Sequence, residues 1–255
     1  MPAAVTATRA VSEDEVEGGR ALLPATRTLE ASICSHYAIL AEASTRLGVH
    51  YKRAVSQVAL FRYGPALEDL DRALREDPGN ADFHFLRGLC CKQLQRLDEA
   101  AQSLQACLRR NPTHLDAVMQ LARVFAHRDE HDRAVEVFAA GARAAQHLPA
   151  FHFELGCSLF QLGRTAEAAQ ALACAVRLDP AREEAHFNLG VALFAQGDFR
   201  AAIASFEEAE RLAPRYVEAA IYAAKAWERL DRLDRAFAVL EGLSSCDNLY
   251  FEAHL

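Results

Sequence analysis

Basic residues are scarce in this 255-residue chain: Lys and Arg number 28, against 35 Asp and Glu, and the formal net charge is −7. A protein surface that binds along the phosphate backbone of a nucleic acid normally has an excess or a cluster of basic residues. The sequence shows neither, so we expect no nucleic-acid partner.

Long apolar runs are missing as well. No stretch of about 18 uncharged apolar residues occurs, so nothing predicts membrane insertion. The start of the chain, MPAAVTATRAVSEDEVEGG, has no apolar run long enough for a secretion signal and soon turns acidic. The seven cysteines are widely spread without a Cys-x-x-Cys pair, which favours reduced thiols in a core. We therefore expect an intracellular, cytoplasmic protein.

Motifs of catalysis are absent too. The sequence has no Gly-rich phosphate loop, no nucleophile elbow and no acidic dyad of the kind that active sites use. Nothing therefore predicts an enzyme, a catalytic residue or a cofactor.

What the chain does have is an internal repeat. Pro78, Pro112, Pro180 and Pro214 are separated by 34, 68 and 34 residues, with Gln146 in the one slot that lacks proline. With each slot numbered position 32, the chain divides without a gap into six blocks over residues 47–250: 47–80, 81–114, 115–148, 149–182, 183–216 and 217–250.

At four positions of the block, the side chain has a similar size in all or nearly all of the six repeats. Position 20 is alanine in every block: Ala66, Ala100, Ala134, Ala168, Ala202 and Ala236. Position 8 is small in every block: Ala54, Gly88, Ala122, Gly156, Gly190 and Ala224. Position 24 is large and apolar: Leu70, Leu104, Phe138, Leu172, Phe206 and Leu240. Position 27 is small except at its last member: Ala73, Cys107, Gly141, Ala175, Ala209 and Leu243.

These columns predict helical hairpins. Positions 20, 24 and 27 share one helix face because four and three residues separate them. Position 8 lies on an earlier helix, and positions 15–17 form the turn, as in Leu-Gly-Arg at 162–164 and Arg-Asp-Glu at 128–130. Small residues let the two helices approach closely, and proline ends the second one. We expect helices to begin near residues 47, 81, 115, 149, 183 and 217, in hairpins that must stack to be stable.

The columns resemble those of the tetratricopeptide repeat (TPR) family. Block 183–216 is the most similar, with family signature residues at Leu189, Gly190, Gly197, Phe199, Ala202, Phe206, Ala209 and Pro214. The resemblance implies an all-α, right-handed α-solenoid with a concave and a convex side. It implies binding of other proteins without naming the partner.

The ends of the chain depart from the repeat. Residues 1–24 are predicted to be disordered. Residues 25–46 are predicted to form a capping helix, with Leu29, Ile33, Tyr37 and Leu40 at helical spacing. Residues 251–255 form a short tail. We expect the last apolar residues to fold back near Phe237 and Leu240 or to enter a partner or a second copy: Leu249, Tyr250, Phe251 and Leu255.

In TPR proteins the first helix of each hairpin lines the concave groove, chiefly through positions 2, 5, 6, 9, 12 and 13. Carried onto this sequence, these positions give the candidate partner-binding residues: Phe85, Met119, Arg123, Phe153, Phe160, Phe187, Asn188, Phe194 and Lys225. Position 2 adds an acidic edge: Asp82, Asp116, Glu184 and Glu218. Such a surface suits an apolar-anchored peptide or helix with some basic character. The same aromatic residues could instead pack between hairpins, and the sequence leaves both roles open.

Two known TPR binding modes are not predicted. The clamp for the C-terminal carboxylate of heat-shock chaperones needs lysine at position 5, where Tyr51 and Phe153 stand, and of its residues only Asn188 is present. The asparagine ladder of the O-GlcNAc transferase superhelix fails because position 6 varies from Lys52 to Tyr222.

Histidines raise the question of a metal. The pattern His-x-x-Glu-His at 127–131 is a zinc-peptidase signature, but that signature needs one continuous helix and the repeat predicts a turn there. Position 4 holds His50, His84, His152 and His186. Packed helices lie about 8–10 Å apart, too far for imidazoles that must each lie about 2 Å from one zinc ion. We expect no metal site and a packing role for these histidines.

Two functions remain open. The first is a non-catalytic scaffold or adaptor that captures a partner segment in its groove. The second is a structural subunit of a larger assembly, for example a trafficking, ciliary or secretion complex, that associates through its convex face or its C-terminal end.

Overall fold

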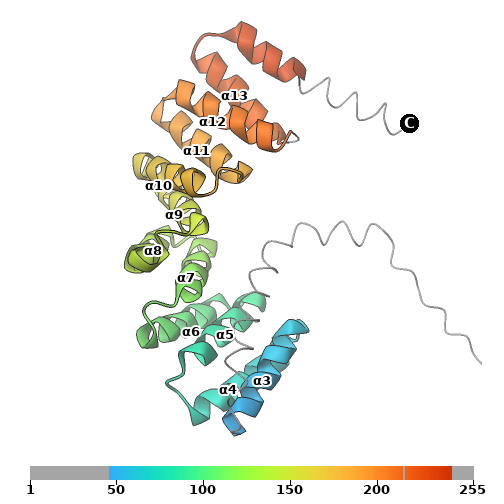
Figure 1. The fold of residues 1–255 in the computed structure, drawn as a ribbon, viewed down its shortest axis with the longest axis vertical. Helices are drawn as coiled ribbons and strands as arrows, with labels where there is room; N and C mark the ends of the chain where they lie inside the picture. The colour runs from blue at the N-terminus through green and yellow to red at the C-terminus, as the bar shows by residue number, and fades with distance from the viewer. Residues whose placement is uncertain (1–45, 215, 243–255) are drawn as a thin grey trace, which may run out of the picture. The chain divides into compact units, whose positions relative to one another are not determined.

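The computed structural model describes residues 46–214 and 216–242, and every regular element in these ranges is a helix (Figure 1). The first helices of the hairpins are α3 (Arg46–Ala59), α5 (Ala81–Gln93), α7 (Leu115–His127), α9 (Pro149–Gln161), α11 (Glu183–Gln196) and α13 (Val217–Arg229). The second helices are α4 (Tyr63–Glu76), α6 (Leu97–Arg110), α8 (His131–Ala145), α10 (Thr165–Leu178), α12 (Phe199–Leu212) and a final helix at residues 233–242. The predicted all-α fold and the predicted helix starts are confirmed.

Three of the predictions made from the sequence fall wholly or mostly on residues outside the described ranges. The predicted disordered segment 1–24, nearly all of the predicted capping helix 25–46 and the apolar residues after 242 lie outside the described residues. None of the described helices combines the length and the apolar character needed to cross a membrane.

The described helices form two compact units that divide between Leu94 and Gln95, a boundary that the repeat pattern does not announce. In the first unit, α4 packs against both α3 and α5. In the second unit, each helix from α6 to α13 packs against the next one along the chain. First helices of the second unit also contact each other, α7 with α9, α9 with α11 and α11 with α13.

A contact between positions 8 and 24 holds the hairpins α9–α10 and α11–α12 together. Position 24 is at most 1% exposed in α4, α6, α8, α10 and α12. A Cβ atom added to Gly190 would lie 2.5 Å from Cε1 of Phe206, and one added to Gly156 would lie 2.6 Å from Cγ of Leu172. The small residue at position 8 is therefore required because the large side chain of position 24 fills the space above it.

The turn within each hairpin has one backbone conformation throughout. Position 15 has a positive φ, between 57° and 84°, in every described hairpin: Phe61, Gln95, Asp129, Gly163, Gly197 and Asp231. Only two of these are glycine, although a residue with a side chain costs about 1–2 kcal/mol in this region. The packing of the two helices therefore imposes the turn where the local sequence does not favour it.

The position-4 histidines have a specific structural role. Nε2 of His84, His152 and His186 lies 3.0, 2.9 and 3.1 Å from the main-chain oxygen of Pro78, Gln146 and Pro180 respectively. In each case the acceptor is position 32 of the preceding block. Three of the four histidines thus tie the loop between hairpins to the helix that follows it.

The zinc-peptidase pattern is divided between two helices, as predicted. His127 ends α7, His131 begins α8, and Asp129 between them has a φ of 58°. The described residues contain no group of His, Cys, Asp and Glu side chains arranged to hold a metal ion.

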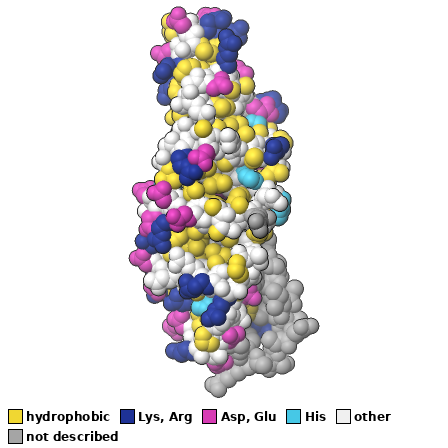
Figure 2. Space-filling model, turned by 90° about the vertical axis from the view of Figure 1, so that its left-hand side faces the viewer, with side chains coloured by type: hydrophobic (Ala, Val, Ile, Leu, Met, Phe, Trp, Pro, Cys, Tyr) yellow, Lys and Arg dark blue, Asp and Glu magenta, His cyan; other side chains and the backbone are white. Residues whose placement is uncertain are grey.

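Charged side chains of both signs lie among hydrophobic ones on the face that Figure 2 shows. No broad patch of one sign is visible on that face among the residues described. Many charged side chains of the described residues form short-range pairs on one helix or turn, such as Arg164 with Glu167 and Arg211 with Glu208. Exposed pairs of this kind contribute at most about 1 kcal/mol each.

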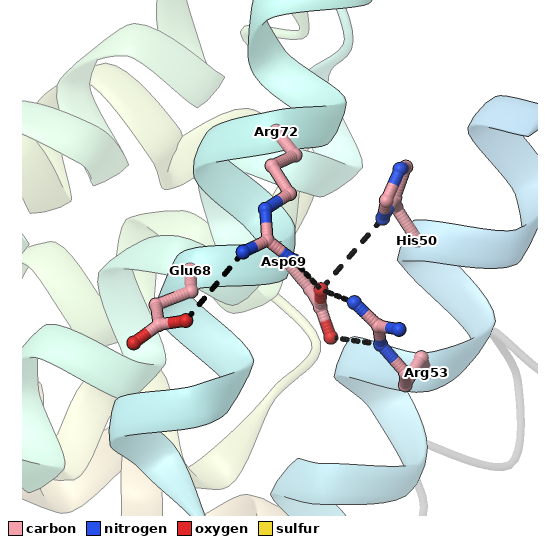
Figure 3. Close-up of polar contacts among 5 residues, drawn as sticks. All are labelled: His50, Arg53, Glu68, Asp69 and Arg72. Atoms are coloured by element: carbon pink, nitrogen blue, oxygen red, sulfur yellow. Dashed lines mark hydrogen bonds and ion pairs between the residues drawn. The ribbon is translucent and has the colours of Figure 1, made fainter.

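Asp69 is the exception, because its carboxylate on α4 is buried in the first unit, at 1% exposure. Figure 3 shows Arg53 and His50 of α3 and Arg72 of α4 directed toward it. Nε of Arg53 donates to Oδ2 at 2.5 Å, Nη2 of Arg53 donates to Oδ1, and Nη1 of Arg72 donates to Oδ1 at 3.3 Å. These hydrogen bonds and positive charges lower the pKa of Asp69, chiefly through Arg53.

The first prediction concerns the packed helix face. Ala202 is fully buried beside Phe206, so Ala202→Leu overpacks the hairpin and is expected to lower the free energy of unfolding by about 1–3 kcal/mol. Urea unfolding measures it. Glu207→Gln, at an exposed position of the same helix, serves as the control and is expected to change little. Equal stability of Ala202→Leu and the wild type would show that the register of α12 is wrong.

The second prediction concerns the turn. Gln95→Gly is expected to raise the free energy of unfolding by about 0.5–1 kcal/mol, because glycine adopts a positive φ without strain. The reverse change, Gly197→Ala, is expected to lower it by about 1 kcal/mol for the same reason. Thermal melts of the two variants beside the wild type provide the comparison. Shifts of the same sign in both would contradict the account of the turn.

The third prediction concerns Asp69. Since its folded-state pKa lies below the unfolded one, its ion pairs stabilise the fold above about pH 4, and this contribution is lost as the pH falls through the lowered pKa. Asp69→Asn should lower the free energy of unfolding at pH 7 by about 1–2 kcal/mol, less than for a wholly buried pair because Arg53 is half-exposed. The difference from the wild type should shrink as the pH is lowered below 4. Asp71→Asn, a change at an exposed carboxylate on the same helix, is the control, and a deficit that does not vary with pH would contradict the assignment.

Candidate partner-binding surface

The predicted binding positions differ in exposure from one first helix to the next. At position 5, Tyr51, Phe85 and Met119 are 5, 2 and 8% exposed, whereas Phe153 and Phe187 are partly exposed and Ile221 is 36% exposed. Phe85 and Met119 thus lie below the surface, where a partner reaches them only if neighbouring side chains move.

Position 9 shows the same trend. Val55 and Leu89 are buried, Arg123 and Cys157 are partly exposed, and Lys225 is exposed. The candidate residues that a partner can contact directly are concentrated on α9, α11 and α13. We call this set the first-helix surface: Phe153, Phe160, Phe187, Asn188, Phe194 and Lys225.

On α9, the two phenylalanines of the first-helix surface have one side in the core and another toward solvent. Phe153 and Phe160 pack against the buried cluster around Leu159 and Leu172. The guanidinium carbon of Arg182 lies 3.9 Å from the centroid of the Phe153 ring. That distance corresponds to a cation–π contact, so the ring face of Phe153 already holds a positive charge.

On α11, Phe187 is the centre of an aromatic cluster. Its ring centroid lies 4.9 Å from that of Tyr216, 5.5 Å from that of Tyr222 and 5.8 Å from that of Phe206. Phe194, seven residues further along the same helix face, lies 6.3 Å from Tyr222 between ring centroids. These rings pack against one another, and all of them except the buried Phe206 are nonetheless partly exposed. The two roles that the sequence left open, packing and contact with a partner, are therefore compatible in the same residues.

Carboxylates surround the aromatic cluster on one side. The pKa of Tyr216 is raised, first by burial and then by the negative charges of Glu184, Glu218 and Glu183. Positive charge lies on the other side, where Nζ of Lys225 is 4.8 Å from the centroid of Tyr222. The cluster is thus bordered by acidic groups at the start of α11 and α13 and by a single lysine within α13.

Arg123 and Asn188 complete the predicted set. Nε of Arg123 donates to Oε1 of Glu154 at 2.7 Å, and this pair ties α7 to α9. Arg123 therefore already has a strong partner within the protein. Asn188 is partly exposed at position 6 of α11, beside Phe187.

Sequence reasoning missed Arg182 and Tyr216, which both occupy position 34. In the first two blocks the same position holds Asn80 and His114, whose side chains accept hydrogen bonds from the start of the next helix. Arg182 and Tyr216 instead stack on position 5 of their own block, on Phe153 and Phe187. In the sequence, position 34 changes from residues that cap helices to residues with large planar side chains. This change could have identified Arg182 and Tyr216 as candidate site residues.

The cysteines of α5 and α9 are ordinary thiols. Burial raises the pKa of Cys157 on α9 to about 11 and that of Cys90 on α5 to about 12. The neighbouring residues Cys90 and Cys91 are not joined by a disulfide.

Comparisons with known proteins agree with this architecture. Two models described as tetratricopeptide repeat match the sequence, one over residues 51–114 and 153–212, the other over residues 93–152 and 193–254. No curated protein matches the chain in sequence.

Solved structures share the fold. MamA from Desulfovibrio magneticus RS-1, from residue 41 to its end, is 19% identical with a TM-score of 0.64, over 68% of this chain and 99% of that one. YrrB, described as a TPR protein with an unusual peptide-binding site, is 20% identical with a TM-score of 0.62, over 67% of this chain and 88% of that one. At this identity the likeness shows the fold alone. Because the two family models together match residues 51–254 without a gap, this chain belongs to the tetratricopeptide repeat family.

Proposed function

We propose that this protein is a non-catalytic, cytoplasmic scaffold that captures a segment of a partner protein on the first-helix surface. In TPR proteins these helices line the concave groove. The observation that carries the proposal is the change in exposure at position 5. The side chain is buried in α3, α5 and α7, partly exposed in α9 and α11, and exposed in α13. Aromatic residues held in place by packing and still partly exposed are the typical anchors of protein interfaces.

The partner segment is apolar-anchored and carries basic residues. An aliphatic or aromatic side chain fits against Phe153, Phe187 and Phe194, which lose exposed apolar area when it binds. Neighbouring Lys or Arg side chains of the partner fit beside Glu184 and Glu218. Arg182 and Lys225 already stack on rings here, which supports the idea that this surface accepts cationic groups.

YrrB offers a limited parallel, since its description names a peptide-binding site on the same fold. The chaperone carboxylate clamp is not part of the proposal, because only one of its residues, Asn188, is present on α9, α11 and α13. A second function, as a subunit of a larger assembly, is favoured by a different feature: large apolar side chains are exposed on the helix at 233–242.

The fourth prediction tests the first-helix surface with peptides selected from a random phage-displayed library against the wild-type protein. We expect the selected sequences to combine apolar and basic residues. The variant Phe153→Leu with Phe187→Leu should bind them about tenfold more weakly, measured by fluorescence anisotropy. Leucine removes the ring faces but keeps most of the apolar volume that packs against the core.

The matched control is Phe85→Leu, the same change at the same repeat position. Phe85 is buried, so its replacement should leave the dissociation constant unchanged. Circular dichroism checks that each variant keeps its helices. Unchanged binding by the double variant, or equal weakening by Phe85→Leu, would place the site elsewhere.

A further inference from the structure

Arg182, which comes directly before α11, lies over the ring of Phe153 on α9. Its guanidinium carbon is 3.9 Å from the ring centroid. The ring is partly exposed, and it also packs against the buried cluster that contains Leu172. Because one side of the ring faces this core, Arg182 covers part of the side that a partner could reach.

The Arg182 side chain does not cap the helix that it precedes. At the same repeat position, Asn80 and His114 accept hydrogen bonds from backbone N–H groups of α5 and α7. Arg182 makes no such side-chain bond to α11. Its side chain is 28% exposed and is held by contacts with other side chains. These contacts can therefore be exchanged for contacts with a ligand without the loss of a helix cap.

Glu184, at position 2 of α11, is the second group that holds Arg182. Nε of Arg182 donates to Oε2 of Glu184 at 3.3 Å, and the Glu184 side chain is 50% exposed. Burial, and after it the negative charge of Glu184, raises the pKa of Tyr216. The Glu184 carboxylate is thus part of the acidic border of the aromatic cluster, and Arg182 connects this border to the Phe153 ring.

The charge of Arg182 also acts on Cys157, which lies one helical turn after Phe153 on α9. Burial and the negative charge of Glu154 raise the pKa of the Cys157 thiol to about 11, whereas the positive charge of Arg182 acts in the opposite direction. The guanidinium therefore lies near positions 5 and 9 of α9, which both belong to the predicted binding positions.

We propose that Phe153 and Glu184 form a subsite for an arginine side chain of the partner, and that Arg182 occupies this subsite in the free protein. The subsite depends on the proposed function and specifies one group of the partner segment. A planar guanidinium can stack on an aromatic ring and donate to a carboxylate at the same time. The aliphatic part of the arginine side chain supplies the apolar contact. The partner's guanidinium makes the contacts that Arg182 makes in the free protein, so Arg182 moves aside when the partner binds.

Competition between the two guanidinium groups follows from this arrangement. The partner breaks the internal cation–π contact and the ion pair before it forms the equivalent contacts itself, so it gains little from them while Arg182 is present. Removal of the Arg182 side chain opens the ring and the carboxylate and strengthens binding. A purely structural role of Arg182 has the opposite consequence, because its removal then loosens Phe153 and weakens binding.

The fifth prediction compares the wild type with Arg182→Gln, using labelled synthetic peptides from the phage library selected against the wild-type protein. Peptides that contain arginine should bind Arg182→Gln about threefold more tightly than the wild type, measured by fluorescence anisotropy. Each arginine of a peptide is then replaced in turn by citrulline, which has nearly the same shape and no charge. At one of these positions, the replacement should make the two proteins bind equally.

Arg211→Gln is the matched control, because it removes the same charge from an ion pair with Glu208 on α12, which is a second helix. It should change the dissociation constants little at physiological salt. Arg182→Lys keeps the charge and loses the planar stack, so it should tighten binding by a smaller factor than Arg182→Gln. Circular dichroism checks the helix content of each variant.

Failure of the subsite and failure of the proposed function give different results. If peptides bind the wild type and Arg182→Gln leaves their binding unchanged or weaker, the subsite is wrong and the proposed function is unaffected. The subsite is also wrong if the gain persists with citrulline at every position, or if Arg211→Gln gives the same gain. If no peptide from the library binds the wild type, the proposed function fails and the subsite fails with it.

Discussion

The large side chain at position 24 of the second helices from α4 to α12 is at most 1% exposed, which requires neighbours on two sides at once. On one side lies the small residue at position 8 of the same hairpin, close enough that a Cβ atom on Gly190 would strike the ring of Phe206. On the other side lies the first helix of the following repeat, as in the contact between Phe138 and Phe151. No hairpin satisfies both requirements alone. The constant length of the repeat, the stacking of the hairpins and the strained turns at Phe61 and Gln95 all follow from this double burial.

The same constraint determines which helix faces are used for stacking and which remain available for the proposed binding. Because the second helices and one face of each first helix are used for stacking, the opposite face of the first helices is free to vary. Its exposed part, on α9, α11 and α13, carries aromatic residues that are fixed in position by neighbouring rings. A rigid, partly exposed aromatic side chain loses little conformational entropy when a partner binds. This is a physical reason why a packing residue such as Phe187 is also suited to contact a partner.

Much of the fold could be predicted from the sequence because its main constraint is periodic. The alanines at position 20, the small residues at position 8 and the prolines at position 32 give the helix starts and the hairpin core. The candidate site was less predictable, because the exposure of one repeat position differs from hairpin to hairpin. A repeat alignment treats Phe85 and Phe187 as equivalent, yet one is buried and the other is partly exposed.

Features that no recurring residue type marks could not be predicted from the sequence. The ion pairs of Asp69 belong to the first hairpin alone, and the left-handed turn at Gln95 has no glycine to announce it. Both depend on tertiary packing, which overrides the preference of the local sequence.

Hydrogen–deuterium exchange of backbone amides tests the central claim, that each second helix is held in place by the first helix that covers it. At low protein concentration, the amides of residues 233–242 should exchange at least about tenfold faster than those of α12, which α13 covers. Protection of residues 233–242 equal to that of α12 at every concentration would show that a second helix is stable without such a cover, and would contradict the account.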